Sequence, residues 1–350
     1  MEIKPFFSVI IPSYNCANEI ERLLDSIVAQ ELSKEDLEVI VCDDNSTDGC
    51  VELMKPYADR LNIKFFTTEP RDIHCPGNTR KDGLSHATGQ WVTFIDNDDA
   101  FEPNVFKGVK DFILTNNCDS MVFTPFREFN PAQVGMIDRE NHILTGYGKT
   151  FDGMTWLHGN FYNRQFLLDN KIDFKENLES HEDLYFNSMI SSLLIGQGKT
   201  HAVYNQFVYK WIYRPNSLSR SYFSEEHYYI EVYLRDYLYS ASEPWIQRYQ
   251  QYPEHKDYYF AQTAFCFLYG YFYYQAALWK NGIERVLPEN KPYLKDMLER
   301  ILSVFKMTRT EFINWIMSQP REYHRVKQES FNGAGLFVEV ESFKDFVYSL

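Results

Sequence analysis

The chain has 350 residues, of which 44% are hydrophobic and 24% are charged, as expected for one large globular domain or two of ordinary size. Its formal net charge of −14 disfavours nucleic acid and anionic lipid as bulk partners, although a local basic pocket could still bind phosphate. Aromatic residues make up 17% of the chain. That is more than a core requires, so tyrosine and tryptophan side chains remain to stack on bases or sugar rings.

No segment predicts export or a membrane anchor. The apolar run at residues 6–11 is flanked by prolines and is too short for a secretory signal. Residues 258–279 carry no charge and are long enough to cross a bilayer, but their glutamines and tyrosines favour a buried or partner-facing helix. The six scattered cysteines are expected to be reduced. We therefore expect a cytoplasmic protein, with association at the inner face of the membrane left open.

The first part of the chain alternates between strand and helix patterns. Apolar runs predict buried strands at residues 7–11, 37–42, 63–66, 91–95 and 121–124. Helices are predicted from Asn18, after Asp48, over about residues 78–86, and from near Pro103. Such alternation predicts an α/β fold with a mostly parallel, twisted sheet and helices on both faces.

The second part has a different pattern. Residues 127–175 are rich in Gly, Asn and Asp and predict loops with short elements. A helix is predicted from about Ser180, and from about residue 222 the pattern is helical and aromatic, with a possible strand at 336–340. We place the domain boundary near residue 220, giving domains of residues 1–220 and 221–350. The second, mainly helical domain would bind the acceptor, form a homo-oligomer or dock on a partner.

Polar loops follow three of the predicted strands, at residues 12–15, 43–49 and 96–99, and the last two are rich in carboxylates. Ligands bind beyond the carboxyl ends of strands in open α/β sheets, so these loops are expected to form one site. Closely packed carboxylates raise one another's pKa unless a cation neutralises them, and Mg²⁺ and Mn²⁺ prefer oxygen ligands. Asp96 and Asp98 form a D-x-D element suited to bridging such a metal to a diphosphate. Helix capping is the alternative, and we favour it for Asp48.

Four ordered motifs, SVIIPSYN at 8–15, VCDDNSTDG at 41–49, GNTRKDGL at 77–84 and FIDNDD at 94–99, resemble the family 2 glycosyltransferases. These are inverting, nucleotide-sugar-dependent enzymes of the GT-A fold. Lys81 departs from the family pattern, in which asparagine normally follows the arginine, and this leaves the role of that position open. The resemblance covers about the first hundred residues and thereafter consists of short elements.

The resemblance implies a donor site in the first domain. Pro12 and Tyr14 would line the base pocket, Asp44 would accept the imide proton of a uracil, and Arg80 would approach the diphosphate. Core packing is the alternative role for Tyr14. Asp96 would reach the ribose and the metal, and Asp98 would ligate the metal, Mn²⁺ or Mg²⁺, directly.

Inverting transfer needs a carboxylate base on the acceptor side. His181-Glu182-Asp183-Leu184 resembles the family's Glu-Asp element, so we predict Asp183 as the base, with Glu182 as the second candidate. Ser180 and Asp183 also form a potential capping box, which would give Asp183 a purely structural role.

Later elements complete the predicted site. Arg214 and Ser217 match a family element that closes over the donor diphosphate, although a solvated surface loop fits their composition equally well. Trp156, His158 and Tyr162 lie where family members place acceptor contacts, and core packing is the alternative for them.

The sequence thus predicts a metal-dependent inverting glycosyltransferase that uses a nucleotide sugar, most readily a UDP-sugar, and a glycan or polymer acceptor. A nucleotidyltransferase on a related fold is one rival, but residues 12–15 lack its glycine-rich basic loop. A non-catalytic sugar-nucleotide-binding protein is the other rival, and the intact D-x-D and Glu-Asp elements argue against it.

Overall fold

A computed structural model describes most of the chain and divides it into two compact units. Unit 1 comprises Met1–Leu178 and Gln197–Arg214, and unit 2 comprises Glu179–Gly196 and Pro215–Leu350. The helix that begins after Ser180 therefore groups with the C-terminal helices, whereas the boundary near residue 220 stays a prediction. The described residues are 4–71, 73, 75–124, 126–130, 133–136, 142–144, 156–199, 201–212, 227–280, 290–332 and 342–350.

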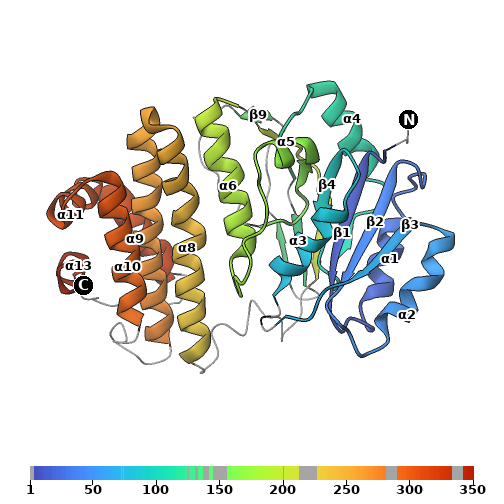
Figure 1. The fold of residues 1–350 in the computed structure, drawn as a ribbon, viewed down its shortest axis with the longest axis horizontal. Helices are drawn as coiled ribbons and strands as arrows, with labels where there is room; N and C mark the ends of the chain where they lie inside the picture. The colour runs from blue at the N-terminus through green and yellow to red at the C-terminus, as the bar shows by residue number, and fades with distance from the viewer. Residues whose placement is uncertain are drawn as a thin grey trace. The chain divides into compact units, whose positions relative to one another are not determined.

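Unit 1 is built on a mostly parallel sheet whose strands follow in the order β3-β2-β1-β4-β10-β6-β11-β9 (Figure 1). Strands β1 (Phe7–Ser13), β2 (Leu37–Asp43), β3 (Asn62–Thr67) and β4 (Trp91–Phe94) pair in parallel. Four of the five predicted strands are these, and the fifth is β6 (Met121–Phe123). The fold class predicted from the alternating pattern is confirmed.

The remaining strands of unit 1 were not predicted. β10 (Phe161–Asn163) lies between β4 and β6 and runs antiparallel to both, while β11 (His201–Val203) and β9 (His142–Leu144) extend the edge. A second, four-stranded sheet contains β5 (Ala100–Phe101), β12 (Tyr209–Ile212), β7 (Phe126–Asn130) and β8 (Gln133–Met136). Strands β7 to β10 lie largely within residues 127–175, for which the sequence predicted loops with short elements.

Helices cover both faces of the main sheet because successive strand residues point to opposite sides. Helices α1 (Ile20–Val28), α2 (Cys50–Met54) and α4 (Phe106–Asn116) contribute to one core with Val9 and Ile11. Helix α3 (Pro76–His86) lies on the other face, where Gly83 packs directly against Ile10. A Cβ at position 83 would clash with that side chain, so the glycine sets how closely α3 approaches β1. The short helices η1 (Lys55–Asp59) and α5 (Arg164–Asp169) complete the unit.

Unit 2 is helical throughout its described residues. Its longest helices, α8 (His227–Gln251) and α9 (Lys256–Lys280), are joined through η2 (Pro253–His255) and pack against each other. The others are α6 (Glu182–Gln197), α10 (Lys291–Phe305), α11 (Arg309–Met317), α12 (Pro320–Asn332) and α13 (Phe343–Ser349). The strand predicted at 336–340 lies outside the described residues.

The apolar segment at 258–279 forms part of α9, and the side chains of Tyr259, Phe267 and Tyr271 are completely buried there. Among the described helices, none combines the length and the apolar character that a membrane crossing demands. The prediction of a buried helix is confirmed, and the aromatic excess of the sequence is used largely within this unit.

Candidate functional site

The loops after β1 and β2 are connected by hydrogen bonds. The backbone N–H groups of Asn15 and Ala17 donate to Ser46 Oγ (2.9 Å) and Asp48 Oδ2 (2.8 Å). Thr47 N–H donates in return to Asn15 Oδ1 (2.9 Å). Asp48 also accepts the backbone N–H of Cys50 at the start of α2, which agrees with the structural, turn-forming role favoured for it, whereas Gly49 is the N-cap residue. Several polar residues of the first two motifs therefore shape the loops.

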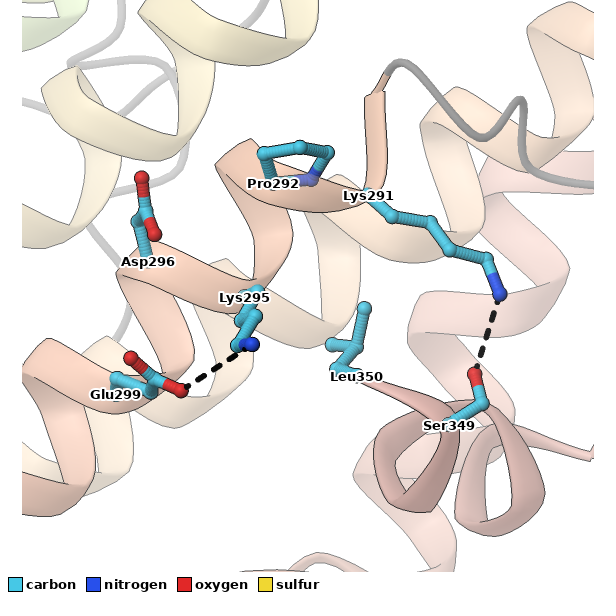
Figure 2. Close-up of a pocket in the computed structure, with 7 residues that line it drawn as sticks. All are labelled: Lys291, Pro292, Lys295, Asp296, Glu299, Ser349 and Leu350. Carbon is cyan, nitrogen blue, oxygen red and sulfur yellow. Dashed lines mark hydrogen bonds and ion pairs between the residues drawn. The ribbon is translucent and has the colours of Figure 1, made fainter.

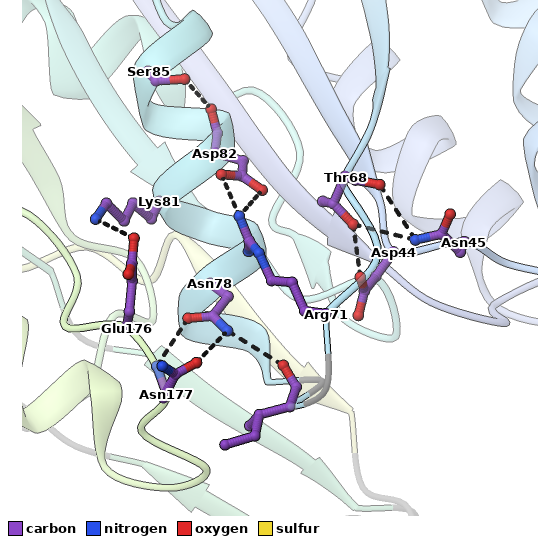
Figure 3. Close-up of polar contacts among 11 residues, drawn as sticks. Asp44, Asn45, Thr68, Arg71, Asn78, Lys81, Asp82, Ser85, Glu176 and Asn177 are labelled. Carbon is purple, nitrogen blue, oxygen red and sulfur yellow. Dashed lines mark hydrogen bonds and ion pairs between the residues drawn. The ribbon is translucent and has the colours of Figure 1, made fainter.

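Asp44 and Tyr14 lie at these strand ends. The Asp44 backbone N–H donates to Ser13 O (2.8 Å), and its carboxylate accepts a hydrogen bond from the Thr68 hydroxyl (2.7 Å, Figure 3). The buried Asp44 carboxylate is therefore fixed in position between the ends of β1 and β3. Tyr14 is 55% exposed, which excludes core packing, whereas Pro12 is buried within β1 opposite Cys42.

Arg80 and Asp96 form an ion pair across the end of β4. Arg80 projects from α3, and its Nη2 lies 2.5 Å from Asp96 Oδ1. The guanidinium is almost completely buried, whereas about a third of the Asp96 side chain is exposed. Two residues predicted to serve the diphosphate and the metal are thus in direct contact.

Asp99, directly after the D-x-D element, is anchored by strand β12. Because β12 runs antiparallel to β5, Ile212 comes next to Asp99 and donates its backbone N–H to Oδ1 (2.7 Å). The Tyr209 hydroxyl donates to Asp99 Oδ2 (2.5 Å) and accepts the Asp96 backbone N–H (3.3 Å). Burial, with Asp98 and Asp96 nearby, raises the pKa of Asp99 well above its ordinary value.

His158 belongs to this cluster because of the antiparallel orientation of β10. Since β10 is antiparallel to β4, residues that precede it lie beyond the carboxyl end of β4. His158 Nε2 lies 3.9 Å from Asp96 Oδ2, and the ring contacts Tyr209 edge-on at 4.7 Å between centroids. Burial lowers the His158 pKa to about 4, with Asp96 opposing and Arg80 adding to the shift. The imidazole is therefore neutral near pH 7, the form that binds metals.

Asp96, Asp99 and His158 offer one ligand atom each within 4.8 Å of one another, a group that could hold a divalent cation. Two carboxylates and a neutral imidazole suit such an ion, and Mn²⁺ accepts imidazole more readily than Mg²⁺. The Asp98 carboxylate is not part of this group, and the Asp98 backbone carbonyl accepts a hydrogen bond from Arg22. Direct ligation by Asp98 stays a prediction.

Helix α3 is tied to the segment that leads towards α6 (Figure 3). Lys81 Nζ lies 2.7 Å from Glu176 Oε1, so the residue that departs from the family pattern makes a surface ion pair. Asn78 accepts the backbone N–H of Asn177 (3.0 Å). These contacts fix the orientation of the helix that carries Arg80.

The other predicted residues belong to other parts of the chain. Tyr162 is completely buried in β10, where core packing accounts for it, whereas Trp156 is partly exposed. Glu182 and Asp183 begin α6 in unit 2. Arg214 and Ser217 lie outside the described residues.

Unit 2 carries a separate hollow beside α10, lined by Lys291, Pro292, Lys295, Asp296, Glu299, Ser349 and Leu350 (Figure 2). Lys295 Nζ lies 4.0 Å from Glu299 Oε1, and Lys291 Nζ lies 3.4 Å from Ser349 Oγ. Because both lysines of this hollow already contact a neighbouring side chain, we assign no function to it.

Comparison with known proteins decides the family. The model of the family described as glycosyl transferase family 2 matches residues 8–176, which include Arg80, Asp96, Asp99 and His158 but not Tyr209. The chain carries a glycosyl transferase family 2 domain. The resemblance seen in the four motifs is thereby confirmed.

Two similar proteins are named for sugar transfer to poly(ribitol-phosphate). The poly(ribitol-phosphate) beta-N-acetylglucosaminyltransferase TarS of Staphylococcus aureus is 30% identical over 192 residues, which cover 51% of this chain and 31% of TarS. The poly(ribitol-phosphate) beta-glucosyltransferase of Bacillus spizizenii is 27% identical, covering 51% of this chain and 28% of that protein. The chain thus spans about a third of the length of these relatives.

Solved structures agree on the fold. The crystal structure of S. aureus TarS 1–349 in complex with UDP-GlcNAc matches with a TM-score of 0.68 and 22% identity, covering 93% of this chain and 92% of that one. A further crystal structure of S. aureus TarS 1–349 matches with a TM-score of 0.67 and 22% identity, covering 95% of this chain and 93% of that one. This similarity supports the predicted fold for the sheet domain and for the helical region that follows it.

Two members of the cluster, Asp99 and Tyr209, are not among the residues predicted from the sequence. His158 is predicted there as an acceptor contact. Asp99 belongs to the predicted loop at 96–99 but was given no role, although a third carboxylate after a D-x-D element was a usable signal. Tyr209 gave no signal, because its contact with Asp99 joins residues 110 positions apart.

Proposed function

We propose that the protein is a metal-dependent, inverting glycosyltransferase that transfers a sugar from a UDP-sugar to a hydroxyl group of a polymer. The cluster of Arg80, Asp96, Asp99 and His158 at the carboxyl end of β4 carries this proposal. It offers a cation for a diphosphate and ligands for a divalent metal within one contact network. Asp44, held between β1 and β3, offers a fixed acceptor for the imide N–H of uracil.

The names of the similar proteins support one class of acceptor. Two of them are named for acting on poly(ribitol-phosphate), and a third, 26% identical over 238 residues, is the minor teichoic acid biosynthesis protein GgaA of Bacillus subtilis. We therefore propose a phosphodiester-linked alditol polymer as the acceptor, with a hexose or an N-acetylhexosamine as the transferred sugar.

In the proposed reaction the Glu182-Asp183 element and the cluster around Asp96 have different roles. Asp183 accepts the proton of the attacking hydroxyl, and Glu182 is the second candidate for this role. Arg80 would bind the donor diphosphate, while Asp96, Asp99 and His158 would hold the metal. A divalent metal, when bound, stabilises the negative charge that develops on the departing diphosphate. Arg214 and Ser217 are proposed to close over the donor.

A donor screen tests this function. Purified protein is incubated with Mn²⁺ and a panel of nucleotide sugars, with and without poly(ribitol phosphate), and released nucleoside diphosphate is measured. We expect release from one UDP-sugar, stimulated by the polymer and lost with chelator or in Asp96→Ala. A panel without turnover, together with no thermal shift from UDP and Mn²⁺, would favour a non-catalytic protein. Pyrophosphate release from a nucleoside triphosphate would instead favour the nucleotidyltransferase.

A further inference from the structure

Asp236 of α8 holds the turn that leads into the proposed base. Its Oδ2 accepts the backbone N–H groups of Glu179 (2.8 Å) and Ser180 (3.0 Å), directly before His181-Glu182-Asp183. Its Oδ1 accepts Arg235 Nε (2.8 Å), and Arg235 Nη2 lies 3.2 Å from Glu179 Oε1. A single carboxylate therefore fixes two consecutive peptide groups of this turn. All of these residues belong to unit 2.

His181 is held on the same face of α8. It has a left-handed backbone with φ of 58°, which is uncommon for any residue except glycine. Its ring lies between Tyr233 and Tyr237, with centroid distances of 4.2 and 5.3 Å, and its Nδ1 lies 2.9 Å from Ser180 Oγ. Strained backbone of this kind costs about 1–3 kcal/mol and persists only where the surroundings enforce it. Successive turns of α8 provide that enforcement.

The position of Asp236 is costly for a carboxylate. Only 1% of the residue is exposed, and burial raises its pKa although Arg235 and the two backbone N–H groups act in the opposite direction. A buried charge of this kind needs full compensation by hydrogen bonds. The compensation comes from Arg235 and from the turn before α6, so the charge and the turn stabilise each other.

Helix α6 is also fixed behind the turn. Its first hydrogen bond runs from Tyr185 N–H to His181 O (3.0 Å), and Tyr185 stacks on Tyr239 of α8. Farther along, Tyr259 of α9 donates its hydroxyl to Ser192 O (3.0 Å). Glu182 and Asp183 thus begin a helix whose start and middle are attached to α8 and α9.

We propose that Asp236 is a positioning residue of the glycosyl transfer: it fixes the Glu179–Ser180 turn and thereby the carboxylate of Asp183 that receives the acceptor proton. This inference rests on the proposed function. It gives the helical region a direct part in the reaction, as the support of the base. A displacement of about 1 Å in a catalytic group can cost about a hundredfold in rate, so the loss of this support is measurable.

The test compares Asp236→Ala with Asp236→Asn and with Glu243→Ala. Asn keeps an oxygen that accepts the two turn N–H groups. Glu243 is the matched control, since it is a buried carboxylate on the same helix that pairs with Arg300 (2.5 Å) and does not contact the turn. Steady-state transfer with the identified UDP-sugar gives kcat and KM, and hydrogen exchange of the amides at 179–185 reports the turn itself.

We expect Asp236→Ala to lower kcat about 10- to 100-fold with the donor KM within about twofold, the signature of a displaced base. Asp236→Asn should recover most of the activity. Glu243→Ala should lower the melting temperature while leaving kcat unchanged. In Asp236→Ala, exchange of the Glu179 and Ser180 amides should accelerate.

Two outcomes overturn the positioning role. One is a kcat for Asp236→Ala within about twofold of an active wild type, since a displaced base should cost more. The other is an equal loss in Asp236→Ala and Glu243→Ala that follows their melting temperatures. A third outcome separates the two proposals. If wild type turns over no donor but the amides of Glu179 and Ser180 still exchange faster in Asp236→Ala, the proposed function is refuted, whereas Asp236 is shown to fix the turn.

Discussion

Arg80 Nη2 lies 2.5 Å from Asp96 Oδ1, so a cation assigned to the donor diphosphate and a carboxylate assigned to the metal neutralise each other in the ligand-free protein. A metal that binds Asp96 must compete with Arg80 unless a second anion attracts the guanidinium. The diphosphate of the donor is such an anion. The contact therefore favours joint binding of metal and nucleotide over binding of either alone.

Replacing Arg80 by alanine separates these two effects. We expect Mn²⁺ to bind Arg80→Ala about tenfold more tightly than wild type without nucleotide, because Asp96 loses its competing partner. UDP in the presence of Mn²⁺ should bind about tenfold or more weakly, because a charged hydrogen-bond donor is lost. Isothermal titration measures both affinities. Lys81→Ala is the control, since it removes a neighbouring cation that pairs with Glu176. Unchanged Mn²⁺ affinity in Arg80→Ala would contradict the competition.

Asp44→Asn tests the base pocket. If the Asp44 carboxylate accepts the uracil imide, the amide should weaken UDP binding about tenfold, the effect of losing one charged hydrogen bond. Discrimination between UDP and CDP should also narrow, because an amide both donates and accepts. Thr68→Val removes the hydroxyl that donates to Asp44 but keeps the carboxylate, so it should have the smaller effect. If Asp44→Asn binds UDP as tightly as wild type, Asp44 does not bind the uracil ring.

The parts of the fold that the sequence predicted are those encoded by local patterns. Strands β1 to β4 are apolar runs with polar residues directly after them, and α1 has Ile20, Leu23, Leu24 and Ile27 on one buried face. The loop that carries Asp96 could be located because strand ends mark the ligand edge of an α/β sheet. In each case a few neighbouring residues contained the information.

Contacts across distant segments could not be predicted in this way. His158 reaches Asp96 only because β10 inserts antiparallel beside β4, and a three-residue strand leaves no readable period. Tyr209 meets Asp99 through the pairing of β12 with β5, which has the same limitation. The hold of Asp236 on the turn before α6 depends on helix packing within unit 2. These relationships are properties of topology, which the local pattern does not specify.

The cluster geometry and the family pattern assign different metal ligands, and two variants distinguish them. We expect His158→Ala to weaken Mn²⁺ binding in the UDP complex about tenfold, the effect of losing about 1.4 kcal/mol of binding energy. Asp98→Asn is the comparison, because its carboxylate lies outside the group of Asp96, Asp99 and His158. Electron paramagnetic resonance of Mn²⁺ measures both. A normal affinity in His158→Ala with a large loss in Asp98→Asn would restore the D-x-D pair as the ligands.

The choice between Asp183 and Glu182 as the base is open to a direct comparison. Asp183→Asn should lower kcat about 10²- to 10⁴-fold, the contribution of a general base, while donor binding remains intact. Glu182→Gln should have the smaller effect, since Glu182 is buried whereas Asp183 is partly exposed. Single-turnover transfer and UDP titration provide the two measurements. A larger loss in Glu182→Gln would exchange the roles, and full activity in both would remove this element from the chemistry.

Glu38 in β2 gives a prediction about stability, far from the strand ends that form the site. Its side chain is completely buried and accepts hydrogen bonds from Lys64 Nζ (2.7 Å), the Ser8 hydroxyl (2.5 Å) and the Thr88 backbone N–H (2.6 Å). Burial alone would raise the pKa of Glu38, but these bonds outweigh it and hold the pKa below its ordinary value. A lowered folded-state pKa means that the stabilisation is present above the ordinary glutamate pKa and is lost as the pH falls through the folded value.

Glu38→Gln should therefore lower the free energy of unfolding of unit 1 at pH 7 by about 2 kcal/mol, since the charged hydrogen bonds from Lys64, Ser8 and Thr88 to the Glu38 carboxylate are lost or weakened. The loss of stability between pH 5 and pH 3 should be less steep in the variant than in wild type. Urea denaturation at several pH values measures both effects. Glu52→Gln, which breaks the exposed pair with Lys55, should change the stability by less than about 0.5 kcal/mol. An equal pH dependence in wild type and Glu38→Gln would show that other carboxylates cause the acid sensitivity of the sheet.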